Sequence, residues 1–375
     1  MLIGVPREIK DQEYRVGLAP AGAYALRQHG HEVLVEMGSG AGVGFSDGSY
    51  EAAGARVVRD AVEVWSAEMV VKVKELQERE YALMHRGQIL FAYLHLAPEP
   101  RLLDALLHAG VIGIAYETVT DAGGGLPLLA PMSRIAGKLS VQFGAWALQT
   151  ANGGSGVLLG GVPGVAPGRV TVIGAGAAGA NAVRVAVGVG ADVTVFDLNT
   201  AALAHLEDLY QGRVKTCYSE PLTLADHVAA ADVIIGATLT PGKLAPKLIS
   251  RGLLKQMRPG SVLVDIAIDQ GGIAETSRPT SFSHPLYVEE GVLHYCVPNM
   301  PSAVARTATL ALTQATLPYV LRLGDEGVNA ALTLDPGLRA GLQVYAGQLT
   351  HRGLAEDLGR PWTPFEAIAA GMRST

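Results

Sequence analysis

One segment, residues 169–197, restricts the possible folds of this chain more than any other. It reads RVTVIGAGAAGANAVRVAVGVGADVTVFD, which is an apolar run, a glycine turn, a helical stretch and a second β-branched run. In the turn, Gly174 permits a tight bend, Gly176 lets the backbone approach a pyrophosphate, and Gly179 lets the helix pack closely against the strand. The helix N-terminus directs unpaired N–H groups and a positive dipole end toward phosphates. The segment therefore predicts a βαβ unit that binds a dinucleotide.

Asp197 ends the segment and bears on which dinucleotide binds. It follows Gly179 by 18 residues, close to the spacing of the acid that accepts hydrogen bonds from the adenine ribose hydroxyls. A plain glycine-rich turn is the alternative interpretation, because the chain has 46 glycines and such patterns recur by chance. Since strand, helix, second strand and acid follow in order, we favour the nucleotide site, and the carboxylate favours NAD over NADP.

The composition argues against several classes of protein. The 375 residues are enough for two or three domains, and the 49% of hydrophobic residues can supply their cores. Only 17% of the residues are charged, the net charge is −6 and the basic residues are scattered, so we expect no nucleic-acid partner and no binding to anionic lipid. The two cysteines, Cys217 and Cys296, lie far apart and are typical of a reducing compartment.

No targeting, membrane or metal signal stands out. The N-terminal residues carry charges where a signal peptide needs apolar residues. Residues 139–168 are uncharged, but glutamines, glycines and two prolines interrupt them, so they predict a buried helix followed by a loop. The histidines lack metal-ligand spacing. We therefore expect a cytoplasmic protein with no membrane span and no metal.

The first third of the chain repeats a short pattern. Apolar runs alternate with helical stretches, and the runs predict strands at 2–4, 33–35, 56–58, 69–73, 89–93 and 111–115. This alternation is typical of right-handed βαβ units and a mostly parallel sheet, here without a phosphate turn. The predicted fold class is therefore α/β, with two Rossmann-like, doubly wound parallel-sheet domains.

Two long apolar stretches, at about 131–151 and 303–323, predict helices that join the domains, with a cleft between the domains. The predicted substrate-binding domain is discontinuous and comprises 1–130 and 303–375. The predicted NAD-binding domain comprises 131–302. Near the end of the chain, residues 337–348 are expected to contribute helical pieces.

Four polar residues fall near predicted strand ends or in the first loop, which is where open parallel sheets bind ligands. They are Arg15, Lys74, His95 and Asp269. Arg15 offers a planar, bidentate donor to a carboxylate, and the alternative is a surface arginine. Lys74 either binds substrate or extends outward to solvent. His95 is either a hydrogen-bonded core residue or an acid/base group.

Asp265 lies at the end of a predicted strand, and Asp269 lies in the loop that follows it. One of them is expected to support the loop while the other faces the nicotinamide. The pattern does not by itself decide between them, and Asp269 is our candidate for the catalytic role.

The stretches GVPREIKDQEYRVGLAP, VVKVKE, GQILFAYLHLA, GGIAET and VPNMPSAVARTAT, together with the glycine segment, resemble alanine dehydrogenases over nearly the whole chain. The resemblance implies NAD-dependent oxidative deamination of L-alanine to pyruvate and ammonium by a homo-oligomer, usually a hexamer. It makes Arg15 and Lys74 ligands of the substrate, and His95 and Asp269 the proton-handling pair. It further implies the residues near the bound molecules: Ser133, Gly174, Gly176, Gly179 and Asp197 at the cofactor, and Asn299 at the substrate.

Arg134 departs from this resemblance, because an acidic residue is expected after Ser133. Two alternatives to alanine oxidation stay open: the soluble NAD-binding component of a proton-translocating transhydrogenase, and a catalytically silent NAD-binding regulator. Lys74 and His95 argue against the transhydrogenase component, as does Arg134-Ile-Ala-Gly where an Arg-Ala-Gln motif is expected.

Tyr93, Met132 and Met300 are candidates for the walls of the substrate pocket.

Overall fold

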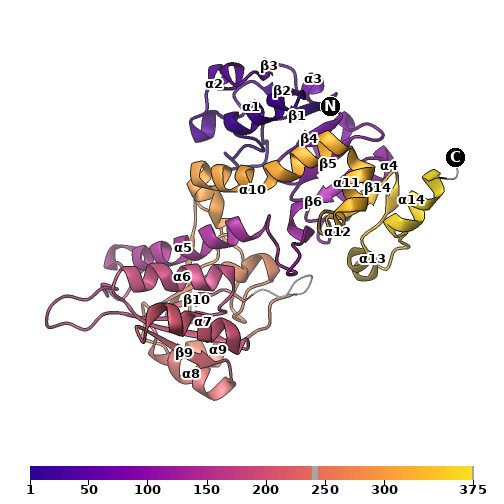
Figure 1. Ribbon diagram of the computed structural model, residues 1–375. Coiled ribbons are helices and arrows are strands. Elements are labelled where there is room, and N and C mark those ends of the chain that lie inside the picture. The colour runs from indigo at the N-terminus through magenta and orange to yellow at the C-terminus, as the bar shows by residue number, and fades with distance from the viewer. Residues whose placement is uncertain (239–243, 374–375) are drawn as a thin grey trace. The chain divides into compact units, whose positions relative to one another are not determined.

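The computed structural model describes residues 1–238 and 244–373. Its chain forms two compact units, one built from Met1–Met132 with Ser302–Thr375 and the other from Ser133–Pro301. Each unit is an α/β structure with its own sheet (Figure 1). The long helix α5 (Ala130–Ala147) contains the first boundary between the units, and the short helix η6 (Met300–Val304) contains the second.

The first unit contains an eight-stranded sheet of order β15-β14-β6-β5-β4-β1-β2-β3. Strands β1 to β6 are parallel, while β14 and β15 are antiparallel additions at one edge. The parallel part runs outward in both directions from β1 and β4, as in a doubly wound sheet. The strands are β1 (Leu2–Val5), β2 (Glu32–Glu36), β3 (Arg56–Val58), β4 (Met69–Val71), β5 (Ile89–Ala92), β6 (Ile112–Ala115), β14 (Leu342–Tyr345) and β15 (Gln348–Leu349).

Local sequence accounts for several helices of this unit. Helices α1 and α4 begin with Pro20 and Pro100, whose fixed φ suits the first turn. Helix α4 ends at Ala109 and is followed by Gly110, which has a left-handed φ of 68°. The helices are α1 (Pro20–Gln28), α2 (Asp47–Ala52), α3 (Ala61–Trp65), α4 (Pro100–Ala109), α10 (Ala305–Glu326), α11 (Val328–Leu334), α12 (Pro336–Ala340), α13 (Arg352–Leu358) and α14 (Phe365–Arg373), with 3-10 turns η1 (Ala41–Val43), η2 (Glu78–Leu83) and η3 (Tyr116–Thr118).

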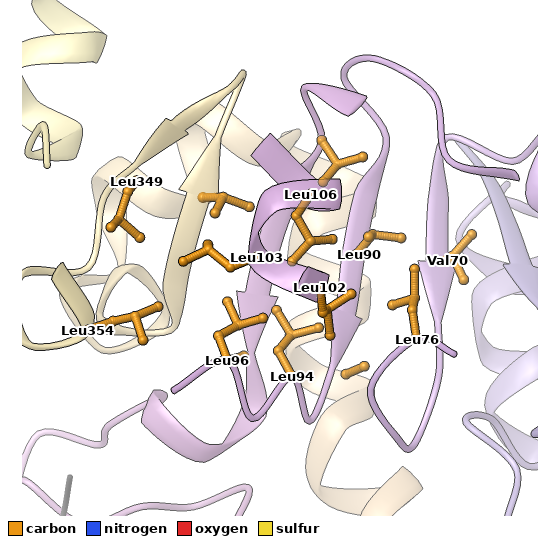
Figure 2. Packing of buried hydrophobic residues seen from close by; sticks show 14 of the residues in the cluster. Val70, Leu76, Leu90, Leu94, Leu96, Leu102, Leu103, Leu106, Leu349 and Leu354 are labelled. Atoms are coloured by element: carbon orange, nitrogen blue, oxygen red, sulfur yellow. The ribbon is translucent and has the colours of Figure 1, made fainter. Parts of the chain in front are cut away.

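A leucine-rich core ties the end of the chain to this sheet. Leu102, Leu103 and Leu106 of α4 pack against residues of β4 and β5, and Leu349 and Leu354 join the same cluster (Figure 2). All five side chains are buried. The C-terminal segment is therefore part of the first unit's core.

The expectation of helix throughout residues 337–348 is wrong. Helix α12 ends at Ala340, and the chain then forms the hairpin β14–β15. Ala346 and Gly347 connect the strands with positive φ values of 49° and 88°, the backbone that a two-residue hairpin turn requires. Since β14 pairs with β6, some 230 residues earlier in the chain, the local sequence did not reveal the strand.

The second unit has a seven-stranded sheet of order β12-β13-β11-β10-β7-β8-β9. All strands except the edge strand β12 are parallel, and their order matches the dinucleotide-binding arrangement 3-2-1-4-5-6. The strands are β7 (Arg169–Ile173), β8 (Asp192–Asp197), β9 (Val214–Tyr218), β10 (Val233–Gly236), β11 (Val262–Asp265), β12 (Leu286–Glu289) and β13 (Val292–Tyr295). The two Rossmann-like units confirm the predicted α/β fold class.

Helices α5 and α6 of this unit pack closely (Figure 1). A Cβ atom on Gly137 of α5 would lie 1.9 Å from the carbonyl oxygen of Ala178 in α6, so only glycine fits this contact. The helices after α5 are α6 (Ala177–Gly188), α7 (Thr200–Tyr210), α8 (Pro221–Ala230) and α9 (Arg251–Leu254), with 3-10 turns η4 (Thr150–Asn152) and η5 (Ile266–Gln270). Across the described residues, no helix has the length and apolar character needed to cross a membrane.

Candidate active site

The glycine turn lies between β7 and α6 in a form that suits a dinucleotide. Gly174 has a φ of 106°, and a Cβ there would lie 2.6 Å from the carbonyl oxygen of Ala237. A Cβ on Gly179 would lie 1.7 Å from the carbonyl oxygen of Gly174, which explains the close approach of helix to strand. Around Gly176, the N-cap of α6, no atom lies within 4 Å of the place a Cβ would occupy. The backbone there is open to a phosphate, and the turn fits a dinucleotide.

Asp197 lies at the end of β8 and binds the glycine turn directly. Its Oδ2 accepts a hydrogen bond from the N–H of Ala175 at 2.5 Å, and its Oδ1 accepts one from Asn199 at 2.7 Å. Each carboxylate oxygen can accept more than one hydrogen bond. Asp197 therefore shapes the turn and retains capacity to accept hydrogen bonds from ribose hydroxyls.

The two acids near the end of β11 have different environments. Asp265 is fully buried and accepts hydrogen bonds from the N–H groups of Ala267 and Ile273, at 3.1 and 2.8 Å, and from the hydroxyl of Ser277 at 2.6 Å. Burial raises the pKa of Asp265, against the effect of these hydrogen bonds. Asp269 lies in η5 and is exposed. Asp265 thus supports the loop, and Asp269 is the acid presented to solvent.

Lys247 also holds this loop, and the sequence analysis missed it. Its ammonium donates hydrogen bonds to the carbonyl oxygens of Gly271, Gly272 and Ala274, at 2.5, 2.9 and 3.0 Å. Gly271 and Gly272 both have positive φ, which turns the chain two residues after Asp269. A single lysine in the sequence is ordinarily a surface residue, so only the folded chain reveals this contact.

In the first unit, Arg15 is buried and paired with Glu13. The guanidinium donates from Nε to Glu13 Oε1 at 2.7 Å and from Nη2 to Glu13 Oε2 at 2.5 Å, and its Nη1 lies 3.3 Å from the sulfur of Met132. Only 2% of Arg15 is exposed, so it is not a surface arginine. Sequence reasoning missed Glu13, although its position two residues before an arginine was a signal.

Lys74 is only 8% exposed and does not extend outward to solvent. Its ammonium lies 3.8 Å from Glu75 Oε2. The N–H groups of Val73 and Lys74 donate to Glu8 Oε1, at 2.6 and 3.3 Å. Glu8 therefore fixes the backbone that carries Lys74.

Lys72, two residues before Lys74, is buried between the carboxylates of Glu8 and Glu80. The ammonium of Lys72 lies 3.1 Å from Glu8 Oε2 and 2.8 Å from Glu80 Oε1. Burial disfavours the charged ammonium, but the two carboxylates raise the pKa of Lys72 above its ordinary value. Lys72 is therefore a structural cation, whereas Lys74 remains the substrate candidate.

Arg15 follows β1 and Lys74 follows β4, the two strands at which the order of the first sheet reverses. Ligands of open α/β sheets bind outside the carboxyl ends of strands at such a reversal. Burial opposes ionisation of Glu13, but the hydrogen bonds and charge of Arg15, followed by the charge of Lys74, lower the pKa of Glu13. The fold thus places both predicted residues after the strands that flank this reversal.

His95 is exposed and follows the end of β5. The interpretation as a hydrogen-bonded core histidine is wrong. Its φ of 47° is left-handed, and its N–H donates to Glu117 Oε1 at 2.8 Å. The imidazole is therefore accessible to a bound molecule.

The remaining candidates have different environments. Tyr93, Met132 and Met300 are buried, and the hydroxyl of Tyr93 donates to the carbonyl oxygen of Leu128 at 2.6 Å. Ser133 is half-buried on α5, and Asn299 precedes η6 with a left-handed φ of 57°. Arg134, the residue that departs from the resemblance, is exposed on α5. No group of three His, Cys, Asp or Glu residues in the described ranges is arranged to hold a metal ion.

Comparison with known proteins places these residues in context. The family model "Alanine dehydrogenase/PNT, N-terminal domain" matches residues 4–136, and "Alanine dehydrogenase/PNT, C-terminal domain" matches residues 140–352. The chain is 56% identical to alanine dehydrogenase of Halomonas elongata over 96% of this chain and 97% of that relative. It is 51% identical to the enzyme of Bacillus subtilis over 98% of this chain and 97% of that relative.

Solved structures show the same relationship. A structure titled L-alanine dehydrogenase superposes with a TM-score of 0.93 at 51% identity, covering 96% of this chain and 99% of the other. A transhydrogenase from Sinorhizobium meliloti superposes with a TM-score of 0.80 at 25% identity, covering 94% of this chain and 99% of the other. The chain is thus more similar to the dehydrogenase than to the transhydrogenase.

Proposed function

Because the chain belongs to the alanine dehydrogenase/PNT family, we propose that it catalyses the reversible, NAD-dependent oxidative deamination of L-alanine to pyruvate and ammonium. One observation carries the proposal: the 56% identity to a relative named alanine dehydrogenase extends over nearly all of both chains. Arg15, Lys74, His95 and Asp269 supply the types of charged and acid/base side chain that this reaction uses.

The second unit holds the cofactor in this proposal. Gly174, Gly176 and Gly179 bring the backbone and the start of α6 to the pyrophosphate, and Asp197 binds the adenine ribose. Ser133 contributes from α5. The cofactor supplies the acceptor for the hydride of the substrate Cα–H. A carboxylate at position 197 favours NAD, because it would repel the 2′-phosphate of NADP.

The first unit binds the substrate. Arg15 and Lys74 supply positive charge to the carboxylate and to the carbonyl of pyruvate. Asn299, a residue of the second unit, is the proposed amide ligand of the substrate. Glu13 holds one edge of the Arg15 guanidinium, so the orientation of this cation is set before substrate binds. This preorganisation reduces the entropy lost on binding.

His95 and Asp269 handle protons. The amino group must be neutral so that its lone pair can expel the hydride, and an imidazole accepts a proton near neutral pH. Water then adds to the resulting iminium carbon, Asp269 accepts a proton from that water, and the carbinolamine releases ammonia to leave pyruvate. In sum, L-alanine, NAD⁺ and water give pyruvate, ammonium, NADH and a proton. We further propose that the chain works in the cytoplasm as a homo-oligomer, a hexamer as the family resemblance implies.

Three measurements on the purified protein separate this function from its alternatives. They are the absorbance of NADH after mixing with NAD and L-alanine, hydride exchange between two nucleotides, and binding of NADH. Formation of NADH that depends on L-alanine supports the proposal. Hydride exchange between nucleotides without any response to L-alanine would favour a transhydrogenase component, and binding of NADH without either reaction would favour a silent regulator.

A further inference from the structure

Glu117 lies beside His95 although 22 residues separate them in sequence. Its Oε1 accepts hydrogen bonds from the N–H of His95 at 2.8 Å and of Leu94 at 3.2 Å, and its Oε2 lies 3.3 Å from the N–H of Leu94. We propose that Glu117 is a positioning residue that holds the backbone of His95 in its left-handed conformation and so directs the imidazole toward the substrate.

The strands explain why an external acceptor is needed. The parallel pairing of β5 with β6 ends at Ala92 and Ala115. Tyr93 still donates its N–H to the carbonyl oxygen of Val73, but the next two N–H groups have passed the end of the ladder. Glu117 lies in η3, directly after β6, so its carboxylate reaches the N–H groups of Leu94 and His95, which the sheet does not pair.

The flanking leucines determine which way His95 faces. Leu94 and Leu96 are 0% and 3% exposed, and both point into the leucine-rich core (Figure 2). With both neighbours anchored on the same side, the residue between them faces away from the core, in agreement with the exposure of His95. Residues with a Cβ rarely adopt a left-handed φ, and such a conformation persists only where surrounding contacts impose it.

Three contacts thus impose the conformation of His95: two anchored leucines and one carboxylate. The leucines fix the chain on either side, and Glu117 fixes the peptide group between them. Because Glu117 binds main-chain N–H groups, its effect on the reaction passes through the placement of His95. The catalytic part of this inference rests on the proposed role of His95.

The test compares Glu117→Ala and Glu117→Gln, each in the natural chain and combined with His95→Ala. Asp121→Ala is the matched control, since Asp121 also accepts two backbone N–H groups, from Gly123 and Gly125, each at 2.8 Å, in an exposed loop of the same unit. Amide hydrogen exchange of the peptide that contains Leu94 and His95 is measured by mass spectrometry, together with kcat for L-alanine oxidation and the dissociation constant of NADH.

We expect Glu117→Ala to accelerate exchange of these two amides and to lower kcat about 10- to 100-fold, the effect of misplacing a reacting group by a small distance. NADH binding stays unchanged. Glu117→Gln keeps most of kcat, because its amide oxygen can still accept both N–H groups. In the His95→Ala background, Glu117→Ala causes no further loss, since the residue it positions is gone.

Two results would overturn the inference. One is unchanged amide exchange in Glu117→Ala, which means that the carboxylate does not hold the peptide. The other is an equal loss of kcat in the presence and absence of the His95 imidazole, which means that Glu117 acts by another route. If the natural protein does not oxidise L-alanine, the proposed function fails, while the exchange measurement still decides whether Glu117 holds His95.

Discussion

The carboxylate of Glu13 accepts two hydrogen bonds from the guanidinium of Arg15, at 2.7 and 2.5 Å, and both side chains are almost completely buried. A buried cation is stable only when it is paired, so Glu13 makes the buried position of Arg15 possible. The two hydrogen bonds also fix the plane of the guanidinium, so the proposed substrate ligand has a defined orientation.

Glu13→Gln should therefore destabilise the protein in a pH-dependent way. Burial opposes ionisation of Glu13, but the hydrogen bonds and charge of Arg15 outweigh it and hold the pKa of Glu13 below its ordinary value of 4.5. A lowered pKa contributes stability that is present above 4.5 and is lost as pH falls through the lowered value. The free energy of unfolding of the natural chain should exceed that of the variant by about 1–3 kcal/mol at neutral pH.

Urea unfolding at neutral pH and at a series of acidic pH values measures this difference. Asp11→Asn changes an exposed acid of the same loop and serves as the control. A stability difference that stays constant down to the lowest pH would contradict the assigned ion pair.

Lys74→Met should lower kcat/KM for L-alanine about 10- to 100-fold, because a hydrogen bond between charged groups is lost at the substrate carboxylate. NADH binding should remain near normal, since Lys74 and the glycine turn belong to different units. Steady-state kinetics and a fluorescence titration with NADH measure the two effects, with Lys215→Met, in an exposed ion pair with Asp192, as the control. Loss of NADH binding with normal use of pyruvate would show that the substrate and cofactor units are assigned the wrong way round.

Asp197→Ala should weaken NADH binding by about 1–3 kcal/mol, the usual effect of losing hydrogen bonds to a charged group. The loss combines the ribose contacts with the support that Asp197 gives to the N–H of Ala175. Asp192→Ala, at the opposite end of β8, is the control. An unchanged dissociation constant for NADH would remove Asp197 from the nucleotide site.

Asp269→Asn should keep the fold and NADH binding but lower kcat by about 10²–10⁴, the range for loss of an acid/base group. The structure supplies a sharp comparison in Asp265→Asn, since Asp265 is the buried acid that accepts the loop's hydrogen bonds. That variant should lose thermal stability. Both oxygens of Asp265 accept hydrogen bonds, and in asparagine one of them is replaced by an NH2 group, which would face an N–H or O–H donor. If Asp269→Asn instead lowered the melting temperature and spared kcat, the roles of the two acids would have to be exchanged.

Consecutive residues carry the information for much of this fold. The turn at Gly174, Gly176 and Gly179 and the acid at Asp197 were predictable, because a βαβ unit is built from one continuous segment with fixed spacings. The parallel strands of the first sheet were predictable for the same reason, since hydrophobic periodicity is a local property. The α/β class of both units follows from these patterns together.

Only the tertiary structure decided the features that depend on distant partners. The strand β14 pairs with β6 far earlier in the chain, so residues 337–348 looked helical. Three features are set by side chains that folding brings together: the burial of Arg15, the burial of Asp265 next to an exposed Asp269, and the hydrogen bond of Glu117 to the N–H of His95. Periodicity along a sequence cannot encode such contacts, because the free energy of burying and pairing a charge depends on what surrounds it in space.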